Sequence, residues 1–538
     1  MYSTRCNEMT ENTGEEAKTS ADTGSMIEVF KGVTDNILVR KVLKGISKYC
    51  SFDKDNRLNV ALQLYTGQKK QACPWCKISA KIISPILKLG SSSFGVTTGE
   101  LKEKFSDVYW RRGLANIIKG IAFFGVRKPF VPGAPFQVVW NVTRRCNLKC
   151  KHCYENAGLA DPDELSTEQA IEVIDKLADA GVIILAFSGG EPTIRKDILK
   201  LIRHAHSRGL YIACATNALT FADRSVVKRF KKAGLEFAQI SLDGLDPDTH
   251  DEFRGVKGAF SKTIQGIKNC VAEGLFVEVA TTATHYNYRE IPALIRYVDG
   301  LGVNWFMVYN FVPTGRGIDI IDQDLTPRER EELLTILWSS LKDKSLKVNC
   351  LSTAPQFARV GIQETEREMG ISLTQVDGQC EQVVVPTHFY NPSFSGKLKN
   401  LASFIGGCGA GRFYMAIEPN GDLYPCVFFP HEKEVKTGNI YRDDFEDIWV
   451  NNHILHDCRD KDTLEGNCGG CVYRYYCGGC RARSFNYFKD LKAPDPGCVN
   501  NEAEWDKLKA KMESGFEKEY IGPDIILKKV RKAKSSTA

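Results

Sequence analysis

Three cysteines, Cys146, Cys150 and Cys153, stand close together in the segment VTRRCNLKCKHCYENAG. Thiolates at these spacings on one loop can hold three irons of a [4Fe–4S] cluster and leave the fourth iron without a protein ligand, whereas electron-transfer clusters normally have four protein ligands. An open iron can bind a small molecule, as open zinc sites do. The loop could instead be a zinc knuckle or a set of buried thiols. This interpretation is weaker, because the loop follows a predicted strand, where α/β active sites form.

A second motif, SGGEPTI, follows the next predicted strand and contains Gly189, Gly190 and Glu191. Glycines let backbone carbonyls approach a ligand, and a carboxylate complements an ammonium group. Alone, this segment would be an ordinary tight turn as readily as a binding loop. Its position one strand–helix unit after the cysteine loop favours binding.

A third group of cysteines lies between residues 408 and 498, among glycine, proline and asparagine turns. Such a stretch cannot build a large apolar core, so bound metal would supply much of its folding free energy. Seven cysteines fit two iron–sulfur clusters as three plus four ligands, and zinc sites are the alternative. They are Cys408, Cys426, Cys468, Cys471, Cys477, Cys480 and Cys498.

Near the N-terminus, ACPWCK contains the CxxC pair Cys73 and Cys76, with Cys50 and Cys6 further away. The pair predicts half of a zinc or rubredoxin-like site, a redox-active dithiol, or inert thiols. The second half of a metal site is not visible locally, so all three interpretations stay open.

The segment 108–126 predicts a helix with an apolar stripe at 4, 3, 4, 3 spacing, accompanied by basic residues. The stripe fits a helix packed on the core. It also fits a helix on a membrane surface, or a lid over an apolar substrate. The stripe consists of Trp110, Leu114, Ile117, Ile121 and Phe124.

The elements that must position the first two motifs alternate regularly between residues 135 and 315. Apolar runs alternate with amphipathic helical patterns such as 166–180, where Ser166 and Gln169 form a capping-box signature. This alternation predicts an α/β fold of parallel βαβ units, either a doubly wound sheet or an incomplete barrel. The predicted strands are 136–142, 182–187, 210–215, 235–241, 276–282 and 303–309.

The whole chain has 538 residues, too many for one ordinary domain. We expect a disordered tail at 1–25, a helical N-terminal extension at 26–134 and the α/β domain at 135–315. A linker at 316–400 with a helix at 327–343, a cysteine-rich domain at 401–500, and a last helix with a basic tail at 501–538 complete the prediction.

Composition narrows the function further. The net charge of +6 is too weak to argue for nucleic acid. The 19 cysteines are odd in number and unevenly clustered, which favours metal ligation in a reducing compartment over a secreted disulfide framework. We find no secretory signal and no run long enough to span a membrane, and therefore expect a cytoplasmic protein.

Together, the cysteine loop and the GGEP segment resemble the radical S-adenosylmethionine (SAM) enzymes. The resemblance covers 135–315 and implies a partial (β/α)6 barrel whose cysteine-loop cluster binds SAM. It places the SAM amino group at Gly189, Gly190 and Glu191. It also implies ribose contacts at Ser241 and Asp243 (QISLDG), a carboxylate contact at Arg254 (DEFRG), and a turn at Thr216–Asn217 where Ala218 replaces the glycine of many members.

The C-terminal array resembles the SPASM extension of radical SAM proteins, which carries two auxiliary [4Fe–4S] clusters. The phrases GCGAGRFYMAIEPNGDLYPCVF and CGGCRARSFNYFKD resemble the subgroup that modifies tetrapyrrole side chains in haem and haem-d1 biosynthesis. Cys380 and Cys458 are distant candidates for a missing fourth ligand of one cluster. The resemblance implies one cluster on Cys468, Cys471, Cys477 and Cys498, and the other on Cys408, Cys426 and Cys480.

The predicted function is that of an oxygen-sensitive enzyme with three [4Fe–4S] clusters. As the resemblance implies, SAM is cleaved reductively to a 5′-deoxyadenosyl radical, which abstracts hydrogen from an unactivated C–H bond. We expect tetrapyrrole side-chain modification, with a ferredoxin or flavodoxin as electron donor and peripheral membrane contact through the N-terminal extension. Maturation of a peptide or protein and modification of a lipid are the alternatives, and an iron–sulfur electron carrier is the non-enzymatic one.

Overall fold

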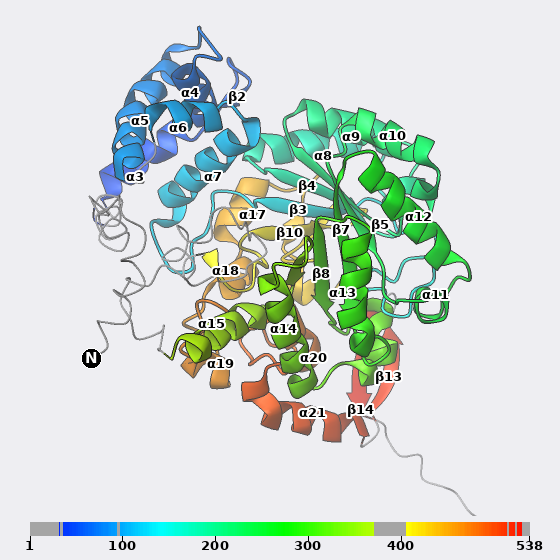
Figure 1. Cartoon of the computed structure of the whole chain (residues 1–538). Coiled ribbons are helices and arrows are strands. Elements are labelled where there is room, and N and C mark those ends of the chain that lie inside the picture. The colour runs from blue at the N-terminus through cyan, green and yellow to red at the C-terminus, as the bar shows by residue number, and fades with distance from the viewer. Residues whose placement is uncertain are drawn as a thin grey trace, which may run out of the picture. The chain divides into compact units, whose positions relative to one another are not determined.

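The computed structural model describes residues 32, 36–93, 97–370, 405–513, 516–521 and 524–529 (Figure 1). The chain forms two compact units. The N-terminal unit comprises Met1–Gly133 with Gly361–Ile405, and the sheet unit comprises Ala134–Val360 with Gly406–Ala538. The tail predicted at 1–25, together with Cys6 and Cys380, lies outside the described residues.

The sheet unit is built on one ten-stranded sheet, in the order β12-β11-β10-β3-β4-β5-β6-β7-β8-β9. Strands β3 to β9 run parallel to their neighbours. Six of them coincide with the predicted strands, which confirms the α/β prediction. These are β3 (Gln137–Asn141), β4 (Ile184–Ser188), β5 (Tyr211–Thr216), β6 (Phe237–Ser241), β7 (Phe276–Ala283) and β8 (Trp305–Asn310).

Helices follow the strands in the order expected of a (β/α)6 arrangement. The first, α8 (Thr167–Ala180), begins at the predicted capping box, in which Ser166 and Gln169 each accept from the other's backbone N–H. Within the described residues, β12 and β9 are the two edges of the sheet, so the arrangement is open. The other helices are α9 (Ile198–Ser207), α10 (Arg224–Ala233), α11 (Pro247–Arg254), α12 (Ala259–Ala272), α13 (Ile291–Gly300) and α14 (Pro327–Lys342).

Segments outside the predicted α/β region also enter this sheet. β9 (Asn349–Ser352) comes from the expected linker and pairs with β8. β10 (Tyr414–Ile417) comes from the cysteine-rich region and pairs in parallel with β3, followed by β11 (Asp422–Tyr424) and β12 (Gly438–Asn439). These strands of two to four residues are too short to show a periodic pattern in the sequence.

The rest of the cysteine-rich region consists of short helices. The region predicted as a last helix and basic tail forms α21 (Glu502–Glu513) and an antiparallel hairpin of β13 (Phe516–Ile521) and β14 (Asp524–Lys529). The helices before α21 are α17 (Phe445–Asn451), α18 (His453–Arg459), α19 (Gly466–Gly470) and α20 (Arg481–Phe488).

The N-terminal unit is mostly helical, as predicted. Leu58, Leu62, Ile83 and Ile118 are among the residues of its core. A short hairpin of β1 (Tyr49–Cys50) and β2 (Asp55–Asn56) interrupts the helices. The helices are α3 (Ile37–Ile46), α4 (Arg57–Thr66), α5 (Pro74–Ser93), α6 (Thr98–Lys104) and α7 (Val108–Phe124).

The buried face of helix α7 overlaps only part of the stripe noted in the sequence, because Leu114 and Ile121 pack against the core of the N-terminal unit. Trp110 and Ile117 of the stripe are 45% and 38% exposed, whereas Ala115, Ile118 and Ala122 are buried. Small side chains let neighbouring backbone approach, so the face that carries them packs most closely. No helix in the described part of the chain is both long and apolar enough to cross a membrane.

Candidate active site

The three loop cysteines come together, as predicted. Cys146, Cys150 and Cys153 follow β3 and pack in one small cluster with Leu148 and Ala259. Burial raises the pKa of Cys146 to about 12 and raises that of Cys150, and the neighbouring thiols add to both shifts. A bound cation deprotonates thiols that are otherwise held neutral, so this group is suited to a metal cluster.

Each of the three sulfurs also accepts a hydrogen bond from an N–H group. Such donors stabilise thiolate over thiol and, in iron–sulfur proteins, influence the reduction potential. The pairs are the Leu148 backbone to Cys146 (3.4 Å), the Ala157 backbone to Cys153 (3.4 Å) and the Arg254 guanidinium to Cys150 (3.6 Å).

The glycines of the GGEP turn are required by its close approach to the cysteine loop. A Cβ on Gly190 would lie 2.2 Å from the Arg145 carbonyl oxygen, and one on Gly189, whose φ is +122°, would lie 2.4 Å from that of Thr143. The Gly190 N–H donates to the Thr143 carbonyl (2.7 Å), and the Glu191 N–H donates to the Arg145 carbonyl (2.8 Å). The two predicted motifs therefore form one connected backbone structure.

The Glu191 carboxylate is fully buried and joins the loops after β4 and β5. It accepts from the Thr216 hydroxyl (2.7 Å), the Asn217 backbone N–H (2.8 Å) and the Thr193 backbone N–H (3.1 Å). Burial raises the pKa of Glu191, and these donors oppose the shift. In this structure, the carboxylate expected to face the SAM amino group is thus hydrogen-bonded within the protein.

Ala218 keeps the turn shape that glycine would favour. Its φ is +60°, in the left-handed region, and it is buried. Gly266 on α12 makes room for it, because a Cβ there would lie 2.6 Å from the Ala218 carbonyl oxygen. The neighbouring Asn217 amide donates to Asn147 of the cysteine loop (2.7 Å). The turn after β5 therefore supports the cysteine loop despite the missing glycine.

Asp243 and Arg254 form a buried ion pair beside Cys150. Arg254 Nη2 lies 2.5 Å from Asp243 Oδ2, and its Nη1 donates to Cys150 Sγ. Asp243 Oδ1 accepts from the Thr282 N–H (2.8 Å), and Ser241 is the half-buried last residue of β6. The residues predicted to contact the ribose of SAM, Ser241 and Asp243, therefore lie at the end of β6, and Arg254, predicted to contact the carboxylate, is the last residue of α11 and already pairs with Asp243.

Sequence reasoning missed a further contact to this loop, from the segment PTGRG after β8. The Arg316 backbone N–H donates to the Cys153 carbonyl (3.0 Å), and its guanidinium donates to the Cys150 carbonyl (3.0 Å). A Cβ on Gly315 would lie 2.5 Å from the Cys153 carbonyl oxygen. The glycine–arginine pair Gly315–Arg316, in the loop that follows the last predicted strand, was the available signal.

In the C-terminal array, Cys468, Cys477 and Cys498 lie close enough to affect one another. Burial raises the pKa of Cys477 well above its usual value, and the Cys498 and Cys468 thiolates add to the shift. The Asp495 and Gly479 backbone N–H groups donate to Cys468 (3.5 Å) and Cys477 (3.4 Å). Cys471 is half-buried at the end of α19.

The other predicted trio, Cys408, Cys426 and Cys480, belongs to one apolar cluster, and Cys458 belongs to it as well. Cys458 is buried, and after burial itself the Cys408 thiolate is the largest factor that raises its pKa, to about 12. The structure thus brings one of the two distant candidates for a fourth ligand to this trio.

Buried cations accompany this second group. Lys461 and Arg481 are 1% and 0% exposed, and their hydrogen bonds go to backbone carbonyls. Burial lowers the pKa of Lys461 to about 8, and the Cys408 thiolate opposes the shift. Buried cations need compensating negative charge. Thiolates on an iron–sulfur cluster would supply it, so the residues present fit such a group.

A cysteine trio and a GGEP turn at the carboxyl edge of a parallel (β/α)6 sheet define a radical SAM enzyme. Comparison with known families agrees. The Radical SAM superfamily matches residues 140–298, and the SPASM iron-sulfur cluster-binding domain matches residues 408–472. The chain belongs to the radical SAM enzymes with a SPASM domain, which use [4Fe–4S] clusters and SAM.

Among its relatives, the chain is 31% identical over 367 residues to the AdoMet-dependent heme synthase of Methanosarcina barkeri, covering 68% of this chain and 97% of that protein. It is 28% identical over 369 residues to the mycofactocin maturase MftC of Mycobacterium ulcerans, covering 68% and 88%. The solved structure of Streptococcus suis SuiB bound to S-adenosylmethionine is similar in fold, with a TM-score of 0.54, 19% identity and coverage of 82% and 94%.

Proposed function

We propose that this enzyme abstracts hydrogen from an unactivated C–H bond in a tetrapyrrole side chain. The observation that carries the proposal is the 31% identity to a heme synthase over 97% of that relative's length. When bound, the cluster and SAM supply the radical chemistry. The protein's own part is to hold the cluster loop, orient SAM and exclude water.

The proposed ligands of the SAM-cleaving cluster are Cys146, Cys150 and Cys153. Their support is the shared cluster of side chains and the N–H donor to each sulfur. We assign SAM binding to the surrounding strand ends, where backbone carbonyls of the GGEP turn suit the ammonium group. The proposed SAM contacts are Gly189, Gly190, Glu191, Ser241, Asp243 and Arg254.

Arg254 would support both SAM binding and the cluster through two contacts. It pairs with Asp243 and donates to Cys150, so it fixes a residue predicted to contact ribose and places positive charge beside a cluster ligand. Arg254→Lys would keep the charge but lose the forked geometry that reaches both partners. We expect that variant to bind SAM more weakly and to shift the cluster potential, which SAM titration and a redox titration would measure separately.

The auxiliary clusters are proposed on the two C-terminal groups. Cys468, Cys471, Cys477 and Cys498 would hold one. Cys408, Cys426 and Cys480 would hold the other, with Cys458 as its fourth ligand. Membership of Cys458 in the same buried cluster supports that last assignment.

The Cys458 assignment is tested with Cys458→Ala after anaerobic reconstitution. We expect iron content to fall towards eight per chain from about twelve, or the electron paramagnetic resonance signal of one cluster to change. Cys350→Ala, a buried cysteine on β9, is the matched control. Unchanged iron and an unchanged spectrum would show that Cys458 is not a ligand of this cluster.

The substrate is tested by incubating the reconstituted protein anaerobically with SAM, dithionite and iron tetrapyrroles that differ in their side chains. A true substrate should lose mass at a side chain, and deuterium placed there should appear in 5′-deoxyadenosine. The variant with Ala at all three loop cysteines should do neither. SAM cleavage without change in any tetrapyrrole would contradict the proposal.

A peptide or protein substrate is the second candidate, favoured by the 28% identity to a maturase over 88% of its length. Transfer of deuterium to 5′-deoxyadenosine from a ribosomally made peptide, and not from a tetrapyrrole, would support this candidate. A lipid is the third, and the same assay with lipid vesicles tests it.

We further propose a cytoplasmic location, a ferredoxin or flavodoxin as electron donor, and peripheral membrane contact through the N-terminal unit. The support for the contact is the exposure of large apolar side chains there, among them Ile37 (71%), Leu38 (69%) and Trp75 (62%). Ile117→Glu on α7 should weaken vesicle flotation without loss of folding. Unchanged flotation, or gross unfolding, would contradict a role for α7 in it.

A further inference from the structure

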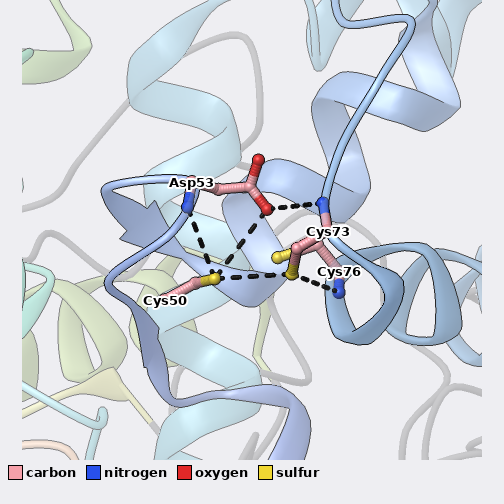
Figure 2. A group of neighbouring side chains, drawn as sticks. All are labelled: Cys50, Asp53, Cys73 and Cys76. Atoms are coloured by element: carbon pink, nitrogen blue, oxygen red, sulfur yellow. Dashed lines mark hydrogen bonds between the residues drawn. The ribbon is translucent and has the colours of Figure 1, made fainter.

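Four potential metal ligands gather in the N-terminal unit, outside the residues matched by either family. The thiols of Cys50, Cys73 and Cys76 and the carboxylate of Asp53 all point towards one another (Figure 2). Their ligand atoms all lie within 4.8 Å of one another. The group unites the CxxC pair found in the sequence with Asp53 and Cys50, which stand 20 and 23 positions before Cys73.

The local structure places these ligands as two similar pairs. Cys50 ends β1 and Asp53 lies in the turn to β2, while Cys73 precedes α5 and Cys76 lies in its first turn. In each pair the second residue's backbone N–H donates to the first sulfur, at 3.5 Å for Cys50 and 3.4 Å for Cys73. The missing half of the metal site is therefore Cys-x2-Asp, which a search for cysteine pairs does not detect.

The distances fit a single tetrahedral ion. With zinc–sulfur bonds of about 2.3 Å, two ligand sulfurs stand about 3.8 Å apart. Cys50 Sγ lies 3.5 Å from Cys73 Sγ and 3.8 Å from Asp53 Oδ2. An iron–sulfide cube would hold its cysteines further apart, because the cube lies between them.

Burial and charge also favour a cation. Cys50, Cys73 and Cys76 are 5%, 8% and 0% exposed. Lys69 donates to Asp53 Oδ1 (2.8 Å), while Oδ2, the oxygen on the thiol side, accepts from the Cys73 N–H (3.0 Å). Three thiolates and a carboxylate exceed the charge of one lysine, and a divalent ion would offset much of the rest. By donating to the oxygen of Asp53 that faces away from the thiols, Lys69 would orient this carboxylate for metal binding.

We propose that Cys50, Asp53, Cys73 and Cys76 bind one structural Zn²⁺ ion, which fastens the β1–β2 hairpin to the start of α5. Four protein ligands fill a tetrahedral zinc site and leave no position for a substrate, so the role is structural and not catalytic. The inference is independent of the substrate proposed above, because these residues belong to the N-terminal unit.

The test is elemental analysis of the full-length protein, purified anaerobically and reconstituted with iron. We expect about one zinc per chain in addition to iron. Cys73→Ala with Cys76→Ala should lose the zinc and keep the iron. The variant with Ala at Cys146, Cys150 and Cys153 should keep the zinc, as should the control Cys350→Ala.

A second series keeps the test decisive if the double variant folds poorly. Asp53→Cys should retain about one zinc, whereas Asp53→Ala should lower zinc affinity, measured by competition with a chromogenic chelator. Replacement with Co²⁺ should give the intense visible bands of tetrahedral thiolate coordination in the wild type. A full-length protein without zinc, with a Cys73–Cys76 disulfide or free thiols, would overturn the proposal, as would mononuclear iron in place of zinc.

Discussion

Among the residues that the structure describes, two groups of side chains, one in each unit, bring three or more potential metal ligands within 4.8 Å of one another. One is the proposed zinc site, Cys50, Asp53, Cys73 and Cys76. The other, in the sheet unit, is Glu155, Glu418 and His431. The groups resemble each other in size and burial, and they differ in the charges around them.

The glutamate group contains its own cation and a neutral histidine. The Arg144 guanidinium donates to His431 Nδ1 (2.9 Å), and His431 Nε2 lies 3.2 Å from Glu418 Oε1. A histidine that accepts at Nδ1 and donates from Nε2 is uncharged, so these contacts assign the tautomer. Arg144 Nε also lies 3.4 Å from Glu155 Oε1, which places the guanidinium beside both partners.

The surroundings of Glu155 favour its protonated form. Burial raises the pKa of Glu155 well above its usual value, and the negative charge of Glu418 raises it further. The Asn141 amide donates to both carboxyl groups, at 2.7 Å and 3.0 Å. A proton on Glu155 and the Arg144 guanidinium, which also pairs with Asp161 (3.1 Å), offset most of the negative charge of this group, so it has less need of a metal ion than the cysteine group. Proximity of ligand atoms is therefore insufficient to predict a metal site, and the surrounding charge decides between the two.

Removal of zinc should have the largest effect: it should destabilise the N-terminal unit and leave the glutamate group and the sheet unit unchanged. Structural zinc sites in small units contribute about 10–16 kcal/mol of apparent binding free energy. A zinc-selective chelator should therefore make residues 36–124 sensitive to limited proteolysis, while the iron–sulfur absorbance of the sheet unit persists. Equal protease resistance with and without zinc would contradict a structural role.

Arg144→Met should have the next largest effect, because it leaves the glutamate group without its cation. Loss of one partner from a buried ion pair typically costs about 3–5 kcal/mol. We expect a lower thermal midpoint at neutral pH and a smaller loss at acidic pH, where a second proton can neutralise the pair. Arg208→Met removes a more exposed pair with Asp175 and should cost under about 1 kcal/mol. Equal losses would contradict the comparison.

The contrast also explains what could be predicted from the sequence. The six parallel strands and the cysteine loop were predictable, because strand–helix alternation and CxxxCxxC spacing are local patterns. Only half of the proposed zinc ligands were predictable, from the CxxC pair. The other half is a Cys-x2-Asp pair, which resembles no cysteine motif, and only the fold brings Asp53 to Cys73. The Glu155–Glu418 pair was not predictable, because strand β10 joins β3 from a segment more than 250 residues later.

Two other features also depended on tertiary structure and could not be read from the sequence. They are the choice of the face that α7 buries and the position of Cys458. Apolar periodicity identified the α7 helix, but the buried face, which carries Ala115, Ile118 and Ala122, overlaps only part of the apolar stripe. Cys458 has no spacing relation to Cys408, and only the fold of α18 brings the two into one cluster.

Lys69→Met should have a moderate effect that is confined to the zinc site. Loss of an outer-shell partner typically lowers metal affinity about 10- to 100-fold. We expect zinc competition to show this shift while SAM cleavage stays unchanged. The neighbouring Lys70→Met, which leaves the Asp53 contact intact, is the control. A matching loss in that variant would indicate a general charge effect and not a contact with Asp53.

The smallest predicted effect is a change in pH dependence at the glutamate pair. The folded protein holds a proton on Glu155 above the ordinary pKa of 4.5, so unfolding releases that proton. The free energy of unfolding should therefore fall by about 1.4 kcal/mol per pH unit as pH rises from 4.5 towards the folded pKa, and then level off. Burial alone would raise the pKa of Glu418, but the His431 contact, the hydrogen bond with Glu155 and the Arg144 charge lower it below 4.5, so its contribution to stability is lost only as pH falls below 4.5. Glu155→Gln imitates the protonated form and should remove the fall in the free energy of unfolding above pH 4.5, which anaerobic thermal denaturation between about pH 5 and 8 would measure.

Parallel curves for the variant and the wild type would mean that Glu155 is ionised in the folded protein. The glutamate group would then carry the uncompensated charge that distinguishes the zinc site.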